Sequence, residues 1–99
     1  MIIELLKVKA QEREQYLQKD AETWTQVLTG CTRFLGKEVW RNLNEPTEVI
    51  LIMGWASRTQ LKSIPLELLN GIEQKFAQQL GNTYQIVESF EYQVHFEQS

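Results

Sequence analysis

The segment EVILIMGWAS, residues 48–57, constrains the fold more than any other part of the chain, because it is apolar at both parities. In a strand, successive side chains point to opposite faces. One face would carry Val49, Leu51, Met53 and Trp55, and the other would carry Ile50, Ile52 and Ala56. A strand here therefore needs cover on both faces, in a chain of only 99 residues.

Hydrophobic periodicity assigns the remaining elements. Ser57-x-x-Gln60 has the form of a helix capping box, and proline at position 65 separates two helices because it suits a first turn and not a helix interior. The sequence predicts strands at 2–9, 36–43, 48–57 and 84–97, and helices at 11–29, 58–63 and 65–80. This order, βαββαβ, predicts an α+β, ferredoxin-like fold with an antiparallel four-stranded sheet and the helices on one face. We expect one domain over residues 1–99.

Finer predictions concern which side chains share a face. In the first helix, a 4-3-4-3 spacing predicts a buried stripe of Leu17, Ala21, Trp24, Leu28 and Cys31. In the last strand, one face is predicted to carry Ile86, Phe90, Tyr92, Val94 and Phe96. Across the hairpin closed by residues 44–47, the predicted pairs are Trp40 with Leu51, Glu38 with Met53, and Gly36 with Trp55.

Charge and composition argue against several classes of function. The net charge is −3 and the pI about 5.1, with the basic residues scattered among acids, so a nucleic-acid partner is not expected. The single cysteine allows no intrachain disulfide, and no apolar run is long enough to span a bilayer, which predicts a cytoplasmic protein without a membrane partner. No metal-ligand spacing, phosphate-binding glycine loop or catalytic triad is visible, so neither a metal nor a cofactor is expected.

The face of the sheet that the helices leave uncovered predicts a partner. Large exposed apolar patches mark interaction sites, and two-fold homodimers are the commonest oligomers. Two such sheets packed face to face would form a closed barrel with the helices outside, and closure also removes exposed strand edges. The interface candidates are Ile50, Ile52 and Val39. The alternative is that one strand is misassigned and the patch is small.

One run of sequence resembles a known family. The run FLGKEVWRNLNEPTEVILIMGWASRTQLKSIP, residues 34–65, is similar to the dimeric α/β-barrel proteins related to antibiotic-biosynthesis monooxygenases. The matching positions are Phe34, Leu35 and Gly36, then Glu45 and Pro46, then Trp55, Ser57 and Arg58. With KDAETW at 19–24 and VESFEYQV at 87–94, the chain most resembles a small cyanobacterial family of undefined function within that superfamily.

The resemblance implies a cleft between the helices and the sheet of each protomer. In oxygenase members this cleft holds a polycyclic aromatic molecule or a haem, and Trp55 matches the tryptophan that lines it. Haem-degrading members also use an asparagine on the first strand and a histidine on the second helix. Here the first strand carries Glu4, and residues 61–68 contain no histidine, which argues against haem degradation.

Six residues are candidates for the wall of this cleft. Trp55, Trp40 and Trp24 could form an aromatic wall for a flat ligand, or could be core residues. Glu38 shares a parity with Trp40, so it could act as an acid or base in an apolar cleft, or pair with a nearby basic side chain. His95, three residues after Tyr92, could be a general base or a solvated residue of an edge strand. The candidates are Trp55, Trp40, Trp24, Glu38, Tyr92 and His95.

Three functions remain open from the sequence. The first is a homodimeric protein that binds a small hydrophobic or aromatic molecule, which is suggested by the two-sided strands and the missing catalytic set. The second is a cofactor-independent monooxygenase acting on an aromatic substrate, which the resemblance alone suggests. The third is a non-catalytic interaction or regulatory domain.

Overall fold

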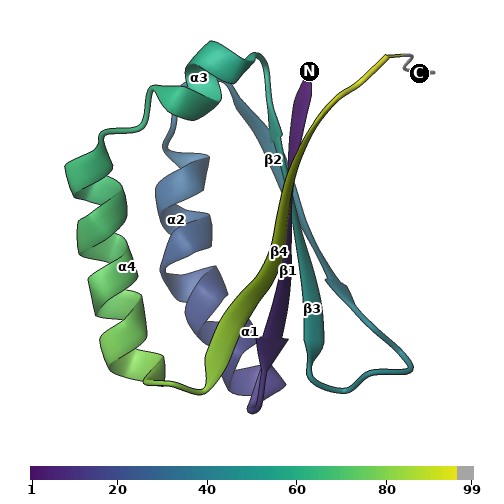
Figure 1. Cartoon of the computed structure of the whole chain (residues 1–99). Coiled ribbons are helices and arrows are strands. Elements are labelled where there is room, and N and C mark those ends of the chain that lie inside the picture. The colour runs from purple at the N-terminus through teal and green to yellow at the C-terminus, as the bar shows by residue number, and fades with distance from the viewer. Residues whose placement is uncertain (96–99) are drawn as a thin grey trace.

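The computed structural model describes residues 1–95, which form a four-stranded antiparallel sheet with the helices on one side of it (Figure 1). The strands are β1 (Ile2–Ala10), β2 (Phe34–Arg41), β3 (Glu48–Trp55) and β4 (Tyr84–Gln93), in the spatial order β2-β3-β1-β4. The helices are α1 (Arg13–Glu22), α2 (Trp24–Thr29), α3 (Arg58–Lys62) and α4 (Leu66–Leu80). The predicted ferredoxin-like α+β fold is confirmed. Over the described part of the chain, no helix has the length and apolar character needed to cross a membrane.

Local signals set the boundaries of α3 and α4 as predicted. Ser57 has an extended backbone, and its hydroxyl accepts a hydrogen bond from the backbone N–H of Gln60 at 3.3 Å, which caps α3. Pro65 precedes the first residue of α4, where its missing N–H costs nothing. Gly81 ends α4 with a φ of 63°, a conformation that favours glycine.

The helix predicted at 11–29 is instead two helices that meet at Thr23. The ψ of Thr23 is −77°, away from the helical value near about −42°. The buried face also differs from the predicted stripe, because Ala21 is exposed while Tyr16 and Asp20 are buried. The break and the shifted face direct a charged side chain, Asp20, toward the sheet.

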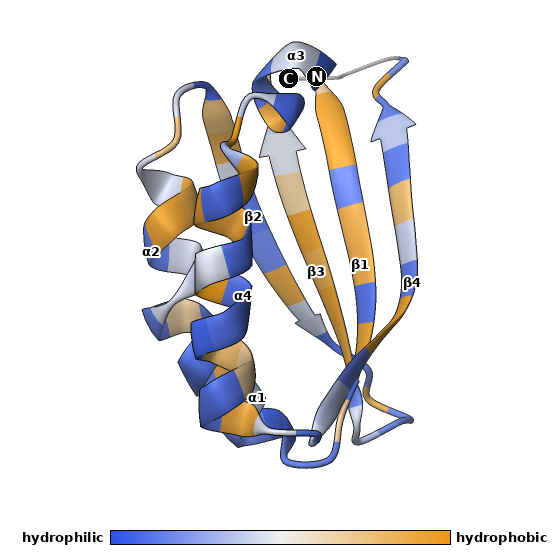
Figure 2. Cartoon of the chain, turned by 60° about the vertical axis from the view of Figure 1, so that its left-hand side comes forward, coloured by the Kyte–Doolittle hydropathy of each residue, from blue (hydrophilic) through white to orange (hydrophobic). Residues whose placement is uncertain are grey.

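The two central strands, β1 and β3, supply most of the core (Figure 2). Their side chains on the helix-covered face are buried, including Val8, Val49, Leu51, Met53 and Trp55. Phe76 and Leu80 of α4 and Leu28 of α2 close the core from the other layer. The apolar positions of one parity of β3 thus lie under the helices.

The register between β2 and β3 differs by one residue from the prediction. Trp40 pairs with Ile50, and Glu38 pairs with Ile52, whereas Leu51 and Met53 had been predicted as their partners. An irregularity between Phe34 and Gly36 accompanies this shift. Because side chains alternate between faces, a slip of one residue moves every side chain of β2 to the opposite face.

A second irregularity divides the predicted face of β4. Lys7 pairs with Glu88 and Val8 with Ile86, so Val87 is an extra residue in β4. Ile86 therefore lies on the helix-covered face, whereas Phe90 and Tyr92 lie on the open face. The prediction that these residues share one face was wrong because a bulge changes the parity. β4 ends at Gln93, Val94 follows it, and Phe96 and the rest of the predicted strand lie outside the described residues.

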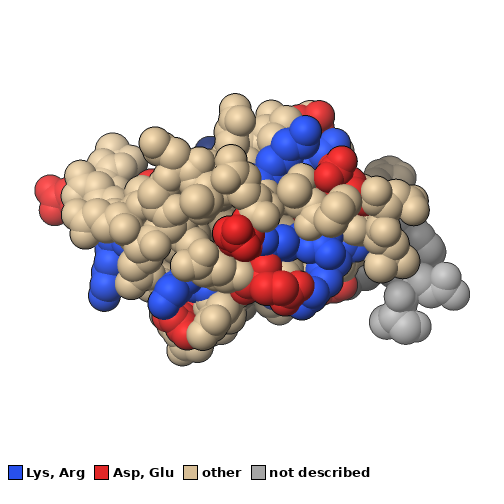
Figure 3. All heavy atoms as spheres, turned by 90° about the horizontal axis from the view of Figure 1, so that it is seen from below, with Lys and Arg blue, Asp and Glu red and all other residues tan. Residues whose placement is uncertain are grey.

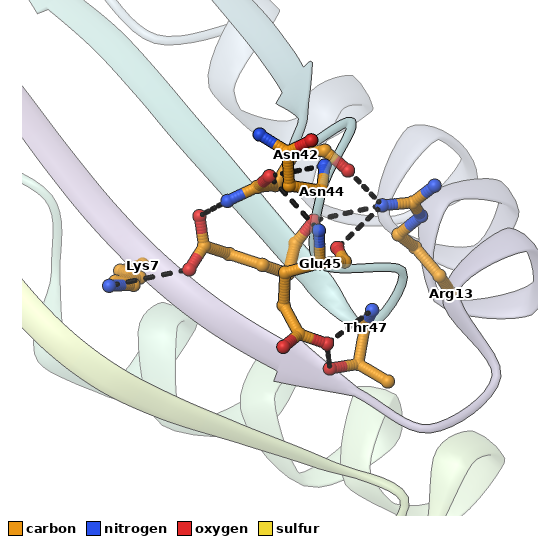
Figure 4. A network of polar contacts seen from close by, with 7 residues as sticks. Lys7, Arg13, Asn42, Asn44, Glu45 and Thr47 are labelled. Atoms are coloured by element: carbon orange, nitrogen blue, oxygen red, sulfur yellow. Dashed lines mark hydrogen bonds and ion pairs between the residues drawn. The ribbon is translucent and has the colours of Figure 1, made fainter.

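A polar network holds the β2–β3 hairpin against the start of α1 (Figure 4). The guanidinium of Arg13 donates hydrogen bonds to the backbone oxygens of Asn42, Glu45 and Glu48, at 3.1, 3.2 and 3.3 Å. Asn42 Nδ2 donates to Glu48 at 2.7 Å, and Lys7 Nζ lies 3.3 Å from the same carboxylate. The hydrogen bond from Asn42, followed by the charge of Lys7, lowers the pKa of Glu48. The network joins three elements at the end of the sheet opposite α3.

Candidate functional site

A cavity of about 600 Å³ lies between the helices and the covered face of the sheet. This volume is within the range of small-molecule sites, about 300–1,000 Å³. From the sheet its walls include Leu6, Leu51, Met53, Trp55 and Ile86, and from the helices Trp24, Leu28, Leu61, Leu69 and Phe76. The buried residues of α4, Phe76 and Leu80, lie in its C-terminal part, where Phe76 packs on Tyr84 with ring centroids 5.2 Å apart.

Trp55 is the most deeply buried aromatic residue in the cavity wall, with no exposed surface. Its indole packs edge-on against Phe34, with ring centroids 5.0 Å apart. Its Nε1 is buried and has no hydrogen-bond partner. A buried N–H without an acceptor is uncommon in native proteins, so this donor is an unsatisfied polar group in the cavity wall.

Glu4 of β1 lies in the cavity wall near Trp55. Burial raises the pKa of Glu4, and the charge of Glu91 raises it further, whereas Lys62 and the nearby indole N–H of Trp55 oppose the shift. The indole is close enough to affect this pKa, but no hydrogen bond to Nε1 is completed in the structure. A carboxyl group with a raised pKa in an apolar cavity can act as an acid or a base.

A buried ion pair forms another part of the wall. Asp20 of α1 is 2% exposed, and the side chain of Lys37, from β2, is 4% exposed. Lys37 Nζ lies 2.6 Å from Asp20 Oδ2 and donates to Thr25 Oγ1 at 3.0 Å. The second carboxylate oxygen, Asp20 Oδ1, is buried and accepts no hydrogen bond.

Tyrosines and a glutamate line the end of the cavity near the C-terminus of α4. Tyr84 donates a hydrogen bond to Glu73 at 2.9 Å, and burial together with this carboxylate raises the pKa of Tyr84 to about 12. Burial, followed by the charge of Asp20, also raises the pKa of Tyr16. Tyr16 contacts Phe76 edge-on at 5.5 Å between centroids. Both phenols therefore stay protonated at neutral pH and serve as neutral wall groups.

The structure brings two of the six predicted cleft residues together. Trp55 and Trp24 line the cavity. Trp40 and Glu38 lie on the open face of the sheet, where Trp40 Nε1 donates to Glu38 at 3.1 Å and Trp40 is 51% exposed. Tyr92 is exposed on the same face, and His95 is exposed just beyond the end of β4. The one-residue register shift and the bulge in β4 account for the placement of Trp40, Glu38 and Tyr92.

The predicted interface residues also divide between the two faces. Ile50 and Ile52 lie on the open face and are half-buried, whereas Val39 pairs with Leu51 and lies on the helix-covered side at the edge strand. Seven apolar residues lie on the open face, and together we call them the open-face patch. They are Ile3, Leu5, Trp40, Ile50, Ile52, Phe90 and Tyr92.

Sequence reasoning did not find Asp20 and Lys37. One signal was present, because Tyr16, Asp20, Trp24 and Leu28 recur every four residues, so Asp20 is one charged residue in an otherwise apolar helical stripe. No comparable signal marks Lys37, since its burial depends on the register of β2.

The charged side chains of the described residues bear on two kinds of site, a metal centre and a patch of one sign on the lower face. Residues 1–95 contain no cluster of three or more His, Cys, Asp or Glu that could hold a metal ion. At the lower end of the molecule, acidic and basic side chains lie next to one another, with no broad area of one sign (Figure 3).

Comparisons with known proteins identify the fold. Neither a family model nor a curated protein sequence matches the chain. SnoaB, a cofactor-independent oxygenase from Streptomyces nogalater, has a TM-score of 0.72 at 11% identity, covering 97% of this chain and 95% of its own. The monooxygenase from the ActVA-Orf6 gene of Streptomyces coelicolor, solved with nanaomycin D, has a TM-score of 0.74 at 7% identity, covering 99% and 90%.

An antibiotic-biosynthesis-monooxygenase-like protein from Deinococcus radiodurans has a TM-score of 0.76 at 13% identity, covering 100% of this chain and 97% of its own. The chain therefore has the fold of antibiotic-biosynthesis-monooxygenase-like proteins, as its sequence resemblance implied. The narrower likeness to a cyanobacterial family stays a prediction.

Proposed function

We propose that this chain is a homodimeric protein that binds a small, mainly apolar molecule in the cavity between its helices and its sheet. The observation that carries the proposal is the cavity itself, which has a volume of about 600 Å³ and mostly apolar walls. Polar residues are interspersed in this wall, among them Glu4, Asp20, Lys37 and Trp55. Apolar walls with a small number of placed polar groups are typical of ligand sites.

The solved structures give further support. One neighbour is described as a cofactor-independent oxygenase and another was solved with nanaomycin D. Identities of 11% and 7% make these likenesses of fold, and function varies widely within a fold. For this reason the proposal rests on the cavity of this chain, and we place it in the cytoplasm as the composition predicts.

Tryptophan fluorescence tests the cavity. Trp55 and Trp24 line it, whereas Trp40 lies on the opposite face. In a W40F protein, we expect titration with 1,4-naphthoquinone to quench emission with a saturable, micromolar dependence. Adding W55F should weaken that binding about tenfold or more, since it removes the indole N–H and part of the aromatic wall. The proposal fails if wild-type protein shows no saturable quench with naphthoquinone, flavin or haem.

The dimer depends on the open-face patch. Its aliphatic members are half-buried in the single chain. Complete burial of an apolar side chain stabilises a folded or assembled state by about 1.5–3 kcal/mol relative to full exposure. We propose that a second copy covers this patch, because seven apolar side chains on one sheet face form a continuous area of the kind that marks an interface.

Light scattering tests the dimer. Wild-type protein should have twice the chain mass at micromolar concentration, and I52K should shift it toward the monomer because a charge would be buried at the centre of the patch. L68K is the matched control, since Leu68 is an exposed residue on α4. A folded wild-type monomer at these concentrations would refute the dimer and leave the cavity proposal standing.

A cofactor-independent monooxygenase is the second candidate, favoured by the raised pKa of Glu4 beside Trp55. Glu4 could then accept a proton from an acidic aromatic substrate. Oxygen uptake with 1,4-dihydroxynaphthalene, above the rate without protein and reduced at least about tenfold in E4Q, would support this reaction. Binding without oxygen uptake favours the binding protein, and no response to any probe favours the interaction domain.

A further inference from the structure

Asp20 is a charged group in the wall of a mostly apolar cavity. It projects from α1 with 2% of its surface exposed, and Lys37 of β2 holds its Oδ2 atom at 2.6 Å. Thr25 of α2 accepts a second hydrogen bond from the same ammonium group, at 3.0 Å. Three elements thus fix the position of one carboxylate.

The other oxygen of this carboxylate, Oδ1, is buried without a hydrogen-bond partner. Among the described side chains, the other buried nitrogen or oxygen in this condition is Trp55 Nε1, and both residues line the same cavity. An ionised carboxylate can accept several hydrogen bonds, and leaving a buried charged acceptor unsatisfied is costly. Two unsatisfied groups in one cavity, one an acceptor and one a donor, are complementary to a ligand that carries both.

We propose that Oδ1 of Asp20 accepts a hydrogen bond from the ligand, so that the cavity selects an uncharged, mainly apolar molecule with an O–H or N–H donor. This inference rests on the proposed ligand-binding function. Lys37 already balances the charge of Asp20 at 2.6 Å, so the pair is neutral and favours a neutral donor over a cationic group. Trp24, Trp55 and Phe76 in the same wall favour a flat aromatic body for that molecule.

The experiment compares three probes of one shape. 2-Naphthol carries a donor, 2-methoxynaphthalene is slightly larger and has none, and naphthalene is slightly smaller and has none. We expect calorimetric titration of the full wild-type chain to show that 2-naphthol binds at least about tenfold more tightly than either of the others, as expected for a hydrogen bond to a charged acceptor.

Variants then assign this preference to Asp20. In D20L/K37M both charges are replaced together, and the affinity for 2-naphthol should become about equal to that for the other two probes. In D20N/K37M the amide oxygen is a weaker, neutral acceptor, so the preference for 2-naphthol should be intermediate. This second variant keeps the test possible if D20L/K37M does not fold. The matched control is E14Q/R41M, because Glu14 and Arg41 form an exposed pair between the same two elements. It should retain the wild-type preference.

The outcomes separate this inference from the function that it rests on. Equal binding of the three probes by wild-type protein overturns the inference and leaves a ligand-binding cavity in place. A wild-type preference that persists in D20L/K37M also overturns it, because the donor would be recognised elsewhere. Binding of none of the three probes overturns both the inference and the proposed function.

Discussion

Replacing Lys37 alone should destabilise the protein far more than replacing it together with Asp20. In K37M the carboxylate of Asp20, 2% exposed, loses the ammonium group that lies 2.6 Å away and remains a buried charge. Breaking a buried pair in this way costs about 3–5 kcal/mol, which is a large part of the roughly 5–15 kcal/mol that keeps a domain folded. D20L/K37M removes both charges, and its free energy of unfolding should lie within about 1–2 kcal/mol of the wild type.

Urea denaturation followed by circular dichroism measures these differences, at one protein concentration because a dimer makes stability depend on concentration. R41M is the control, since the Arg41–Glu14 pair has side chains 50% and 70% exposed and should cost about 0–1 kcal/mol. A K37M penalty no larger than that of R41M would refute the reasoning.

Three further predictions concern other parts of the structure. F76A should lower the free energy of unfolding by about 3–5 kcal/mol, measured by urea denaturation, because Phe76 is 1% exposed between Tyr16 and Tyr84. E4Q should stabilise the protein at pH 7, because the pKa of Glu4 is raised in the folded state. The stability of the wild type therefore falls as the pH rises above the ordinary pKa of a glutamate. In a pH series of thermal melts, E4Q should lack this fall. R13A removes three hydrogen bonds to backbone oxygens of the hairpin, so it should cost about 1 kcal/mol and speed amide hydrogen exchange at 42–48.

Much of the fold could be predicted from local signals. The helix start at Ser57, the separation of α3 from α4 at Pro65 and the end of α4 at Gly81 follow from the chemistry of those residues and are found where expected. The element order then predicted the ferredoxin-like arrangement. Trp55 was also a candidate for the cavity wall, because the resemblance to a known family pointed to this side chain, and it lines the cavity.

Less of the candidate site could be predicted, because two side chains that form it depend on contacts between distant segments. Asp20 and Lys37 are 17 positions apart and meet only once β2 has taken its place beside β3. Nothing in the local pattern of β2 distinguishes the observed register from one shifted by a residue. The face that Lys37 occupies was therefore not predictable, and Glu38, its neighbour, was assigned to the cleft instead.

The amino-acid sequence by itself determined the order of strands and helices and the apolar character of both faces of β3, because these follow from periodicity and from single residues that start or stop a helix, whereas the break that divides α1 from α2 was not predicted. Only the tertiary structure decided which face each side chain of β2 and β4 occupies. A strand that is apolar on both faces accepts neighbouring registers almost equally well. The choice among them is made by the irregularity before Gly36, the extra residue Val87, and the ion pair that joins β2 to α1.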